Sequence, residues 1–322
     1  MASGVFWIST PLPFAGLRQV NLWLLKDGDG WAMVDCGFGY EPAREVIDAA
    51  WRATLGEAPV TRLVVTHFHP DHAGNSAWIG ERWGVRPLMT QGEWFAANIA
   101  MRDDFEESVP RRVAFYREHG LSEDRLAVFQ NGAMRYSTGV RLPYSFERLR
   151  DGDTLAIGDD RWTIITGEGH SPEHAALYCA ERRLLISGDQ ILPTITTNIS
   201  VWPTEPDGDP LSLFLESGRC FAGLLHPDTL VLPSHRLPFR NVHRRLDELA
   251  HHHQDRLDLI LRTGGREVAA AELIDVLFPR KLDGHQMGFA MGEAIAHLNH
   301  LVTIGRMERV TDAGRTRYRK RG

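Results

Sequence analysis

Residues 66–74 read Thr66-His67-Phe68-His69-Pro70-Asp71-His72-Ala73-Gly74. An apolar run at 63–66 leads into this stretch and predicts a strand. Alternate side chains of an extended segment share a face, so His67 and His69 point the same way as the strand ends. Pro70 fixes its own backbone and restricts the residue before it, so the chain turns and presents Asp71 and His72 from another angle. The spacing predicts two adjacent metal half-sites, each short of ligands.

The residue types fit a metal better than a polar turn. A lone surface histidine is usually a solvated side chain, and His-Pro-Asp-His alone would suit a turn. Four such residues directly after a buried-type strand favour metal ligation instead. Imidazole nitrogen and carboxylate oxygen are ligands of borderline metals such as Zn²⁺, with Fe and Mn as alternatives.

The missing ligands are expected at three later strand ends, where an α/β scaffold gathers functional groups. A predicted strand at 162–166 runs into a loop with His170 and His174. Predicted strands at 184–187 and 230–232 run into Asp189 and His235. Each signal is weak alone, but together with the first motif and in this order they form a strong pattern.

This ordered set resembles the pattern of the metallo-β-lactamase-fold hydrolase superfamily, over about residues 15–240. The resemblance implies an α/β fold, a four-layer αβ/βα sandwich of two sheets flanked by helices with the site at one sheet edge. It implies two divalent metal ions per chain, Zn being the first choice. The implied ligands are His67, His69 and His170 for one ion, Asp71, His72 and His235 for the other, and Asp189 as a bridge between them.

Further roles follow from the same resemblance. Two ions would hold a hydroxide between them. The hydroxide would form at neutral pH because metal-bound water reaches a pKa of about 7, against 15.7 in bulk. Asp71 and Asp189 are the expected catalytic residues, and Asp71 is also a candidate proton acceptor. Asp35, at an early strand end, is expected to support the site. His174 is expected to orient a ligand and not to bind metal.

Composition limits the alternatives. The chain has 322 residues, 43% of them hydrophobic, and a net charge of −6. No apolar stretch reaches the roughly 18 residues of a membrane span, and residues 1–10 lack the features of a secretory signal. Three scattered cysteines suit reduced thiols in the cytoplasm.

The chain is expected to form two domains. Residues 1–262 form the catalytic domain, with a helical insertion at about 93–149. The break at Thr263-Gly264-Gly265 marks the boundary. Beyond it, helices at 268–277 and 289–304 and a basic hairpin around 312–314 predict a small winged-helix-like domain at 263–322.

Substrate preference is read from the surroundings of the motif. The loop after Asp189 is long and mostly uncharged, and the insertion is rich in aromatic residues, although about half of these are expected to pack in the core. Apolar walls suit a small molecule with an acyl part, so hydrolysis of an ester, thioester or lactone is favoured. The candidate pocket residues are Ile191, Trp202, Trp94, Phe115 and Tyr116.

The C-terminal tail supports different readings. Residues 306–322 hold seven basic and two acidic side chains, a composition that attracts nucleic acid. The alternatives are a metal-dependent endoribonuclease or phosphodiesterase and a non-enzymatic nucleic-acid-binding sensor. A redox activity on iron ranks lower. Winged helices also serve as dimer elements, so a homo-oligomer is left open.

Overall fold

The computed structural model describes residues 3–14, 16–103, 105–263 and 265–321, so Gly264 of the predicted domain boundary lies outside the described residues. The chain forms two compact units. Unit 1 comprises residues up to 102, 135–197 and 220–246, and unit 2 comprises 103–134, 198–219 and 247 onward. This division differs from the predicted one, because most of the predicted helical insertion belongs with the C-terminal part of the chain.

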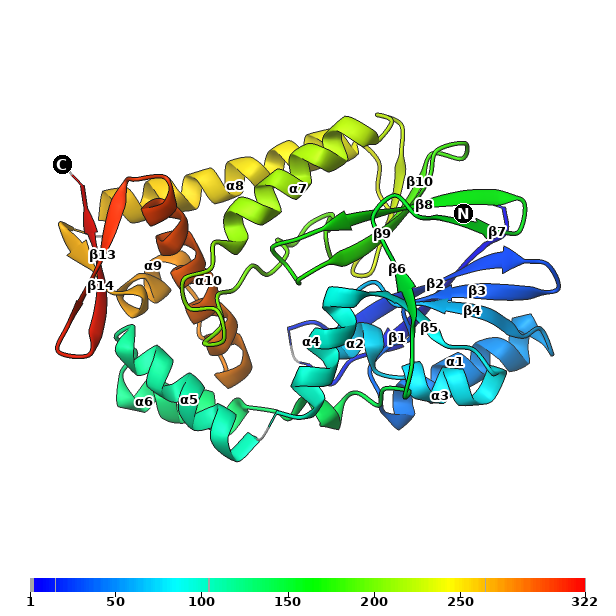
Figure 1. Cartoon of the computed structure of the whole chain (residues 1–322), viewed down its shortest axis with the longest axis horizontal. Helices are drawn as coiled ribbons and strands as arrows, with labels where there is room; N and C mark the ends of the chain where they lie inside the picture. Colours follow the sequence, from blue (N-terminus) through cyan, green and yellow to red (C-terminus); the bar gives the residue numbers. More distant parts are fainter. Residues whose placement is uncertain (1–2, 15, 104, 264, 322) are drawn as a thin grey trace. The chain divides into compact units, whose positions relative to one another are not determined.

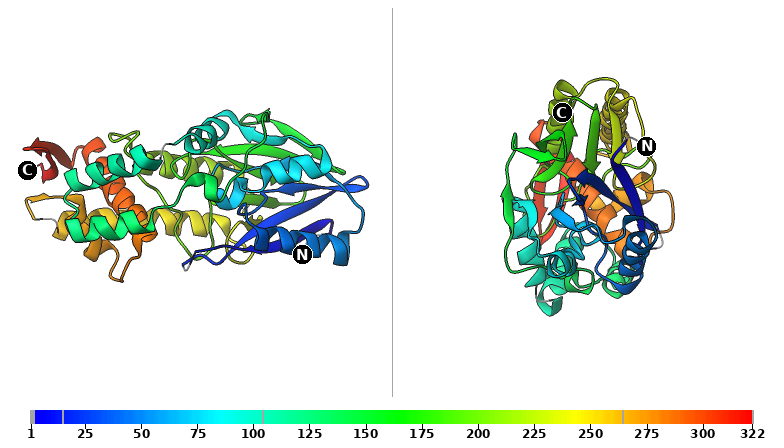
Figure 2. Two further views of the ribbon diagram at one scale, coloured as in Figure 1. Left: turned by 90° about the horizontal axis from the view of Figure 1, so that it is seen from below. Right: turned by 90° about the vertical axis from the view of Figure 1, so that its right-hand side faces the viewer.

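Unit 1 contains two β-sheets (Figures 1 and 2). The first has the strand order β1 (Val5–Pro11), β2 (Gln19–Asp27), β3 (Gly30–Val34), β4 (Val60–Val64), β5 (Pro87–Thr90) and β6 (Glu147–Leu149). The second has the order β11 (Leu230–Pro233), β10 (Leu184–Gly188), β9 (His174–Cys179), β8 (Asp160–Gly167) and β7 (Thr154–Ile157). Strands β3 and β4 are parallel, as are β10 and β11. Each of these pairs therefore ends at one sheet edge, where the predicted site residues follow.

The core of unit 1 lies between these sheets. Trp23 and Leu25 of β2 meet Trp162 and Leu177 of the second sheet there. The intervening Leu24 is also fully buried. Because successive side chains of a strand face opposite ways, the first sheet must be covered on both faces. Helices α1 (Glu41–Ala50) and α3 (Ser76–Trp83) pack on it (Figure 1), which gives the predicted α/β sandwich.

Unit 1 contains further helical segments. A turn of π-helix (Trp51–Leu55) extends α1, and α2 (Pro70–Ala73), α4 (Gln91–Met101) and a 3₁₀ turn (Tyr136–Thr138) complete the set. Helices α7 (Pro210–Leu224) and α8 (Val242–Thr263) have residues in both units.

Unit 2 is built around α10 (Gly284–Thr303), which is buried along most of its length. Its other elements are α5 (Phe105–Glu118), α6 (Glu123–Gly132), a 3₁₀ turn (Ala270–Leu273), α9 (Ile274–Leu277) and the antiparallel strands β12 (Glu267–Val268), β14 (Arg315–Lys320) and β13 (Met307–Asp312). Helix, helix and hairpin therefore follow one another as predicted. Helix α10 starts five residues before the predicted 289, because Asp283 and Gln286 form a capping box.

The helices of the insertion pack on α10. A Cβ atom on Gly284 would lie 2.2 Å from the carbonyl oxygen of Val128 and 2.8 Å from Cα of Gly132, so α6 and α10 approach at glycines. The Tyr116 hydroxyl donates to the carbonyl of Gly288 at 3.2 Å. These contacts explain why residues 103–134 belong to unit 2.

Other differences from the predicted elements are local. The stretch predicted as a helical insertion ends in β6, which pairs in parallel with β5 (Leu88 opposite Glu147). Helix α7 was not predicted, although Asp209 and Pro210 provide a helix start signal. Among the residues that the structure describes, no helix has both the length and the apolar character needed to cross a bilayer.

Candidate metal centre

The loop after β4 carries the first four candidate ligands. Strand β4 ends at Val64, and His69 is extended, with ψ 148°, immediately before Pro70. Pro70 then opens the short helix α2, where its missing N–H and fixed φ are tolerated. Asp71 and His72 lie in that first turn and reach the site from a different direction than His67 and His69.

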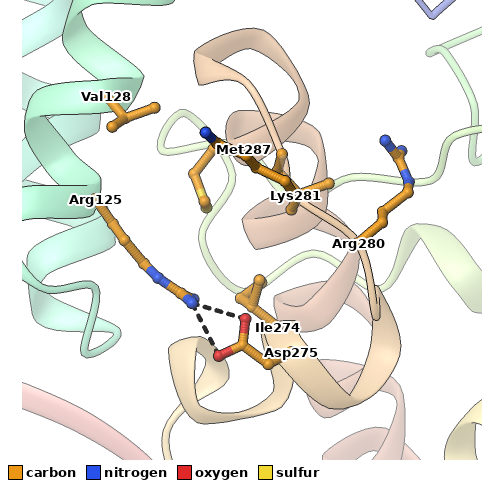
Figure 3. A pocket seen from close by; sticks show the side chains of 8 residues that line it. Arg125, Val128, Ile274, Asp275, Arg280, Lys281 and Met287 are labelled. Atoms are coloured by element: carbon orange, nitrogen blue, oxygen red, sulfur yellow. Dashed lines mark hydrogen bonds and ion pairs between the residues drawn. The ribbon is translucent and has the colours of Figure 1, made fainter.

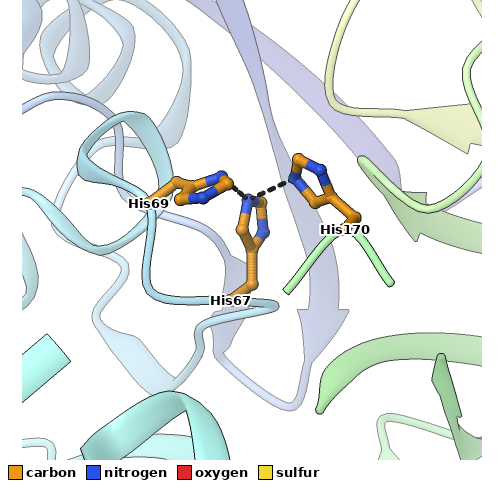
Figure 4. A group of neighbouring side chains, drawn as sticks. All are labelled: His67, His69 and His170. Carbon is orange, nitrogen blue, oxygen red and sulfur yellow. Dashed lines mark hydrogen bonds between the residues drawn. The ribbon is translucent and has the colours of Figure 1, made fainter. Parts of the chain in front are cut away.

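The first group of donors consists of His67, His69 and His170 (Figure 4). Nε2 of His67 lies 2.9 Å from Nδ1 of His69 and 3.2 Å from Nε2 of His170. Zn–N bonds of 2.0–2.1 Å in a tetrahedral site separate two nitrogens by about 3.3 Å. The spacing of these three nitrogens therefore fits one bound metal ion.

The second group consists of Asp71, His72 and His235. Oδ2 of Asp71 lies 3.4 Å from Nε2 of His235 and 3.7 Å from Nε2 of His72. Asp189 reaches both groups, because its Oδ2 lies 3.4 Å from Nε2 of His235 and 3.8 Å from Nε2 of His170. The structure thus brings together all seven residues predicted as ligands, and their ligation remains a prediction.

Three buried atoms at this point lack an ordinary hydrogen-bond partner among the described residues. They are Nε2 of His72, Nε2 of His235 and Oδ1 of Asp189. A buried polar atom left unsatisfied costs about 1–3 kcal/mol. A divalent cation would satisfy such atoms, so the donor set fits the metals that the sequence pattern implies.

The electrostatics of the two groups differ. Burial holds the pKa of His67 well below its usual value and lowers that of His69 to about 3, so both rings are neutral, as metal ligands must be. Burial also opposes charge on His235, but Asp189 and Asp71 outweigh it and raise the His235 pKa to about 10. Burial would raise the pKa of Asp71, yet His72 and His235 lower it to about 2. The carboxylates therefore stay ionised, and the second group attracts positive charge.

Asp35 orients the ligands from behind. It follows β3 with φ 62°, a left-handed conformation that aspartate tolerates better than most residues. Its Oδ1 accepts from the backbone N–H of Thr66 at 2.8 Å, and its Oδ2 lies 2.8 Å from Nδ1 of His72. The Thr66 hydroxyl links Asp35 to Nδ1 of His67, at 3.0 Å from each. With Nδ1 engaged in this way, Nε2 of each histidine faces the site.

His174 lies behind Asp189. Its Nε2 accepts from the backbone N–H of Asp189 at 3.1 Å, and it belongs to neither donor group. A Cβ atom on Gly188 would lie 2.3 Å from this nitrogen, so glycine is required for the close approach. This geometry suits the predicted orienting role of His174.

Glu93, the first residue of the predicted insertion, is a buried residue that was not predicted to belong to the site. It lies in the first turn of α4 and is fully buried. It accepts from Phe68 N at 2.9 Å, from the Ser171 hydroxyl at 2.6 Å and from Glu173 N at 2.8 Å. Burial raises the pKa of its carboxyl to about 7, against the pull of these donors. No sequence motif marks it, because its partners are 25 to 80 residues away.

The predicted pocket residues mostly lie in packed interiors. Ile191 is fully buried in unit 1, and Trp94 stacks on Phe146 at 4.6 Å. Phe115 and Tyr116 are buried in unit 2, in contact with each other. Trp202, also in unit 2, packs edge-on against Phe289. Their role as a substrate wall remains a prediction.

Unit 2 contains a small hollow of about 190 Å³ between α6 and the segment that leads into α10 (Figure 3). Arg125, Arg280 and Lys281 line it with an apolar floor that includes Met287. Arg125 makes two bonds to the Asp275 carboxylate, at 2.7 and 2.8 Å. Asp275 therefore balances the charge of Arg125, and a hollow lined by two further basic side chains does not by itself indicate an anionic ligand.

The basic tail is likewise partly neutralised. Arg317 pairs with Glu267 and Glu272, and Arg319 pairs with Glu267 and Glu308. Arg309 pairs with Asp207. Exposed ion pairs add little stability, but they reduce the positive charge available to a nucleic acid. The observed pairing weakens the electrostatic argument for an endoribonuclease.

A two-sheet α/β sandwich that gathers five histidines and two aspartates at one edge defines a metal-dependent hydrolase. The family described as the Metallo-beta-lactamase superfamily matches residues 15–235, and the Metallo-beta-lactamase-like, C-terminal domain matches 258–321. The chain therefore belongs to the metallo-beta-lactamase superfamily.

Individual relatives agree with this assignment. A beta-lactamase domain protein of Burkholderia ambifaria, known from a crystal structure, is 40% identical, with a TM-score of 0.92 over 100% of this chain and 93% of its own. A probable metallo-hydrolase of Bacillus subtilis (strain 168) is 24% identical over 92% of each chain. The acyl-coenzyme A thioesterase MBLAC2 of Gallus gallus is 27% identical over 59% of this chain. This chain spans 64% of that thioesterase's length.

Proposed function

We propose that this metallo-hydrolase is a dinuclear enzyme that cleaves the acyl C–O or C–S bond of an ester, thioester or lactone, with an acyl thioester as the preferred substrate class. The observation that carries the dinuclear part is the position of Asp189. Its Oδ2 lies 3.8 Å or less from His170 of the first donor group and from His72 and His235 of the second. A carboxylate in that position suits a bridge between two ions.

Each side chain has a defined task in this scheme. The bound ions would lower the pKa of a water and polarise the scissile carbonyl. Asp35 and the carbonyl of Gln19, the latter 2.8 Å from Nδ1 of His235, keep the ring orientations of His72 and His235 fixed. Asp71 is ionised, and the proposed scheme gives it ligation as its main task, with proton acceptance as a second, candidate task.

The thioester preference rests on two supports. The chicken relative carries the name of an acyl-coenzyme A thioesterase, and the loop after Asp189 is poor in charged residues. A small-molecule substrate with an apolar acyl part suits such surroundings better than a polyphosphate does. Zinc is the proposed metal, and Fe and Mn would fit the same nitrogen and oxygen donors.

The test combines metal analysis with a substrate panel. Purified protein is expected to hold two divalent ions per chain and to hydrolyse acyl-coenzyme A thioesters faster than lactones, β-lactams or single-stranded RNA. Chelation should abolish turnover, and Asp189→Ala should lower kcat by more than about 100-fold, beyond the usual cost of losing an outer orienting group. Asp160→Asn, which alters a partly exposed ion pair with Arg182, serves as the matched control and should keep the wild-type rate.

Two outcomes would contradict the proposal. Full activity after chelation would exclude the metal mechanism. Cleavage of RNA without turnover of any ester or thioester would favour the endoribonuclease alternative.

A further inference from the structure

The first donor group is assembled from loops of two different sheets. His67 and His69 follow β4 of the first sheet, whereas His170 lies in the loop between β8 and β9 of the second. Packing between two sheets is apolar and non-directional, so it does not by itself set a separation of 3.2 Å between ring nitrogens. Some directional contact must hold the two loops in register.

Glu93 provides such a contact, in addition to the backbone bond from the N–H of Ala175, in β9, to the carbonyl of Thr66 at 2.8 Å. Its Oε2 accepts from the backbone N–H of Phe68, the residue between His67 and His69. Its Oε1 accepts from the hydroxyl of Ser171, the residue after His170, and from the N–H of Glu173. One buried carboxylate therefore binds both ligand loops at once. All three partners donate, so an ionised carboxylate matches them with no donor left over.

The link is reinforced from the other side. Oε2 of Glu173 accepts from the N–H of Gly92 at 2.8 Å, and its carbonyl accepts from the Thr90 hydroxyl at 2.7 Å. A Cβ atom on Gly92 would lie 3.0 Å from Cβ of Glu173, so the segment that enters α4 approaches the His170 loop closely. The reciprocal bonds make the start of α4 a fixed spacer between the loops.

We propose that Glu93 is the positioning residue that sets the distance between the His67–His69 loop and His170, and thereby the affinity of the first metal position relative to the second. The inference rests on the proposed dinuclear function. Glu93 is not itself a ligand, because both of its oxygens are occupied by donors and it belongs to neither donor group. The second group does not depend on it, since Asp35 and the Gln19 carbonyl orient His72 and His235.

Titration of the metal-free full chain with Co²⁺ alone tests the proposal, with absorbance and calorimetry as readouts. The wild-type chain should bind two ions in resolvable steps. Glu93→Gln exchanges one acceptor oxygen for an amino group that faces a donor, and it should weaken one step by about 10–100-fold, the usual cost of losing an orienting group. Ser171→Ala removes a single donor and should weaken the same step less.

The control is Ile157→Val, which removes one methylene from the core between the sheets. It should lower the melting temperature slightly without changing either Co²⁺ step. Equal weakening of both steps in Glu93→Gln would show a merely structural role and overturn the proposal, as would wild-type affinities for both. Ser171→Ala decides the question if Glu93→Gln does not fold. Failure of the wild-type chain to bind two ions would instead overturn the dinuclear function.

Discussion

Asp35 is not one of the predicted metal ligands, but its carboxylate orients several residues of the site. Its two oxygens serve Thr66 and His72, and Thr66 in turn contacts His67. The left-handed φ of 62° aims the side chain at these partners. A change at this residue should therefore act on the ligands without altering the donor set.

Asp35→Asn is the sharpest test of this role, because asparagine also tolerates a left-handed backbone. Its amide keeps the bond from Thr66 N but places an NH₂ group opposite both His72 Nδ1 and the Thr66 hydroxyl, which share Oδ2 of Asp35. We expect metal affinity to fall by about 10–100-fold while the fold is retained, as measured by metal titration and circular dichroism. Unchanged affinity would mean that His72 is held by its packing alone.

Gly188→Ala is expected to destabilise unit 1. The residue has φ +53°, and a Cβ atom would lie 2.3 Å from Nε2 of His174. The left-handed backbone costs about 1–2 kcal/mol, and crowding in a packed interior costs about 1–3 kcal/mol more. Chemical denaturation measures the loss. Gly223→Ala is the matched control, because a Cβ atom there meets nothing within 4 Å on α7, and it should be neutral or stabilising by up to about 1 kcal/mol.

At the residue scale, the metal ligands could be predicted because their spacing along the chain is local. Residues whose role depends on long-range contacts could not be predicted. His67, His69, Asp71 and His72 lie within six residues, and a strand followed by proline constrains how they point. Glu93 has no such local signature. Its role exists only because the loops after β4 and β8 approach each other in the folded chain.

At the scale of elements, the N-cap of helix α7 makes a pH-dependent contribution to stability. Asp209 precedes Pro210, accepts from Ser212 N at 3.0 Å as an N-cap, and lies 3.2 Å from Nδ1 of His300. Burial would raise the Asp209 pKa, but His300 and Ser212 lower it to about 2. Because the folded pKa lies below the usual value, the ionised cap stabilises above about pH 4, and this is lost as pH falls toward 2.

Asp209→Ala should therefore cost about 1 kcal/mol at neutral pH, as loss of an N-cap typically does. The difference in unfolding free energy between wild type and variant should shrink between about pH 4 and pH 2. Urea denaturation at several pH values measures it. A difference that stays constant down to pH 2 would show that the cap acts without its charge.

Element boundaries could be predicted where the sequence carries a local signal, such as an apolar run or a capping residue. Residues 184–187 were predicted as a strand and form β10, which begins at the same residue and ends one residue later. The early start of α10 comes from a capping box at Asp283 and Gln286, a signal that is visible in the sequence but lies before the apolar stripe of the helix. Strand β6 has no alternating pattern of its own, and its pairing with β5 alone makes it a strand.

For the whole molecule, order along the chain is a poor guide to the compact units. Three separate segments make up unit 2. Residues 103–134 join α10 by close approach at Gly132 and Gly284 and by the bond from Tyr116 to Gly288, and Val201 N donates to the carbonyl of Gly292 at 3.1 Å. Composition and periodicity depend on residues that are neighbours in sequence. They therefore predicted a boundary at 263, whereas α5 and α6 pack with the residues beyond it.

Deleting residues 263–322 should therefore do more than remove a tail. It would take away α10 and expose Tyr116 and Phe129, which are buried in unit 2, at about 1.5–3 kcal/mol for each large apolar side chain. We expect aggregation and rapid proteolysis within 103–134. A soluble truncated chain with protected α5 and α6 would mean that the insertion folds without α10.

Truncation removes the basic charge of the tail and disrupts folding at the same time. An RNA-binding role is therefore better tested by neutralising exposed side chains of the tail (Arg306→Gln, Arg315→Gln and Arg321→Gln). That triple variant should keep thioester turnover at the wild-type rate, and any affinity for single-stranded RNA that depends on the tail should fall and become less sensitive to salt.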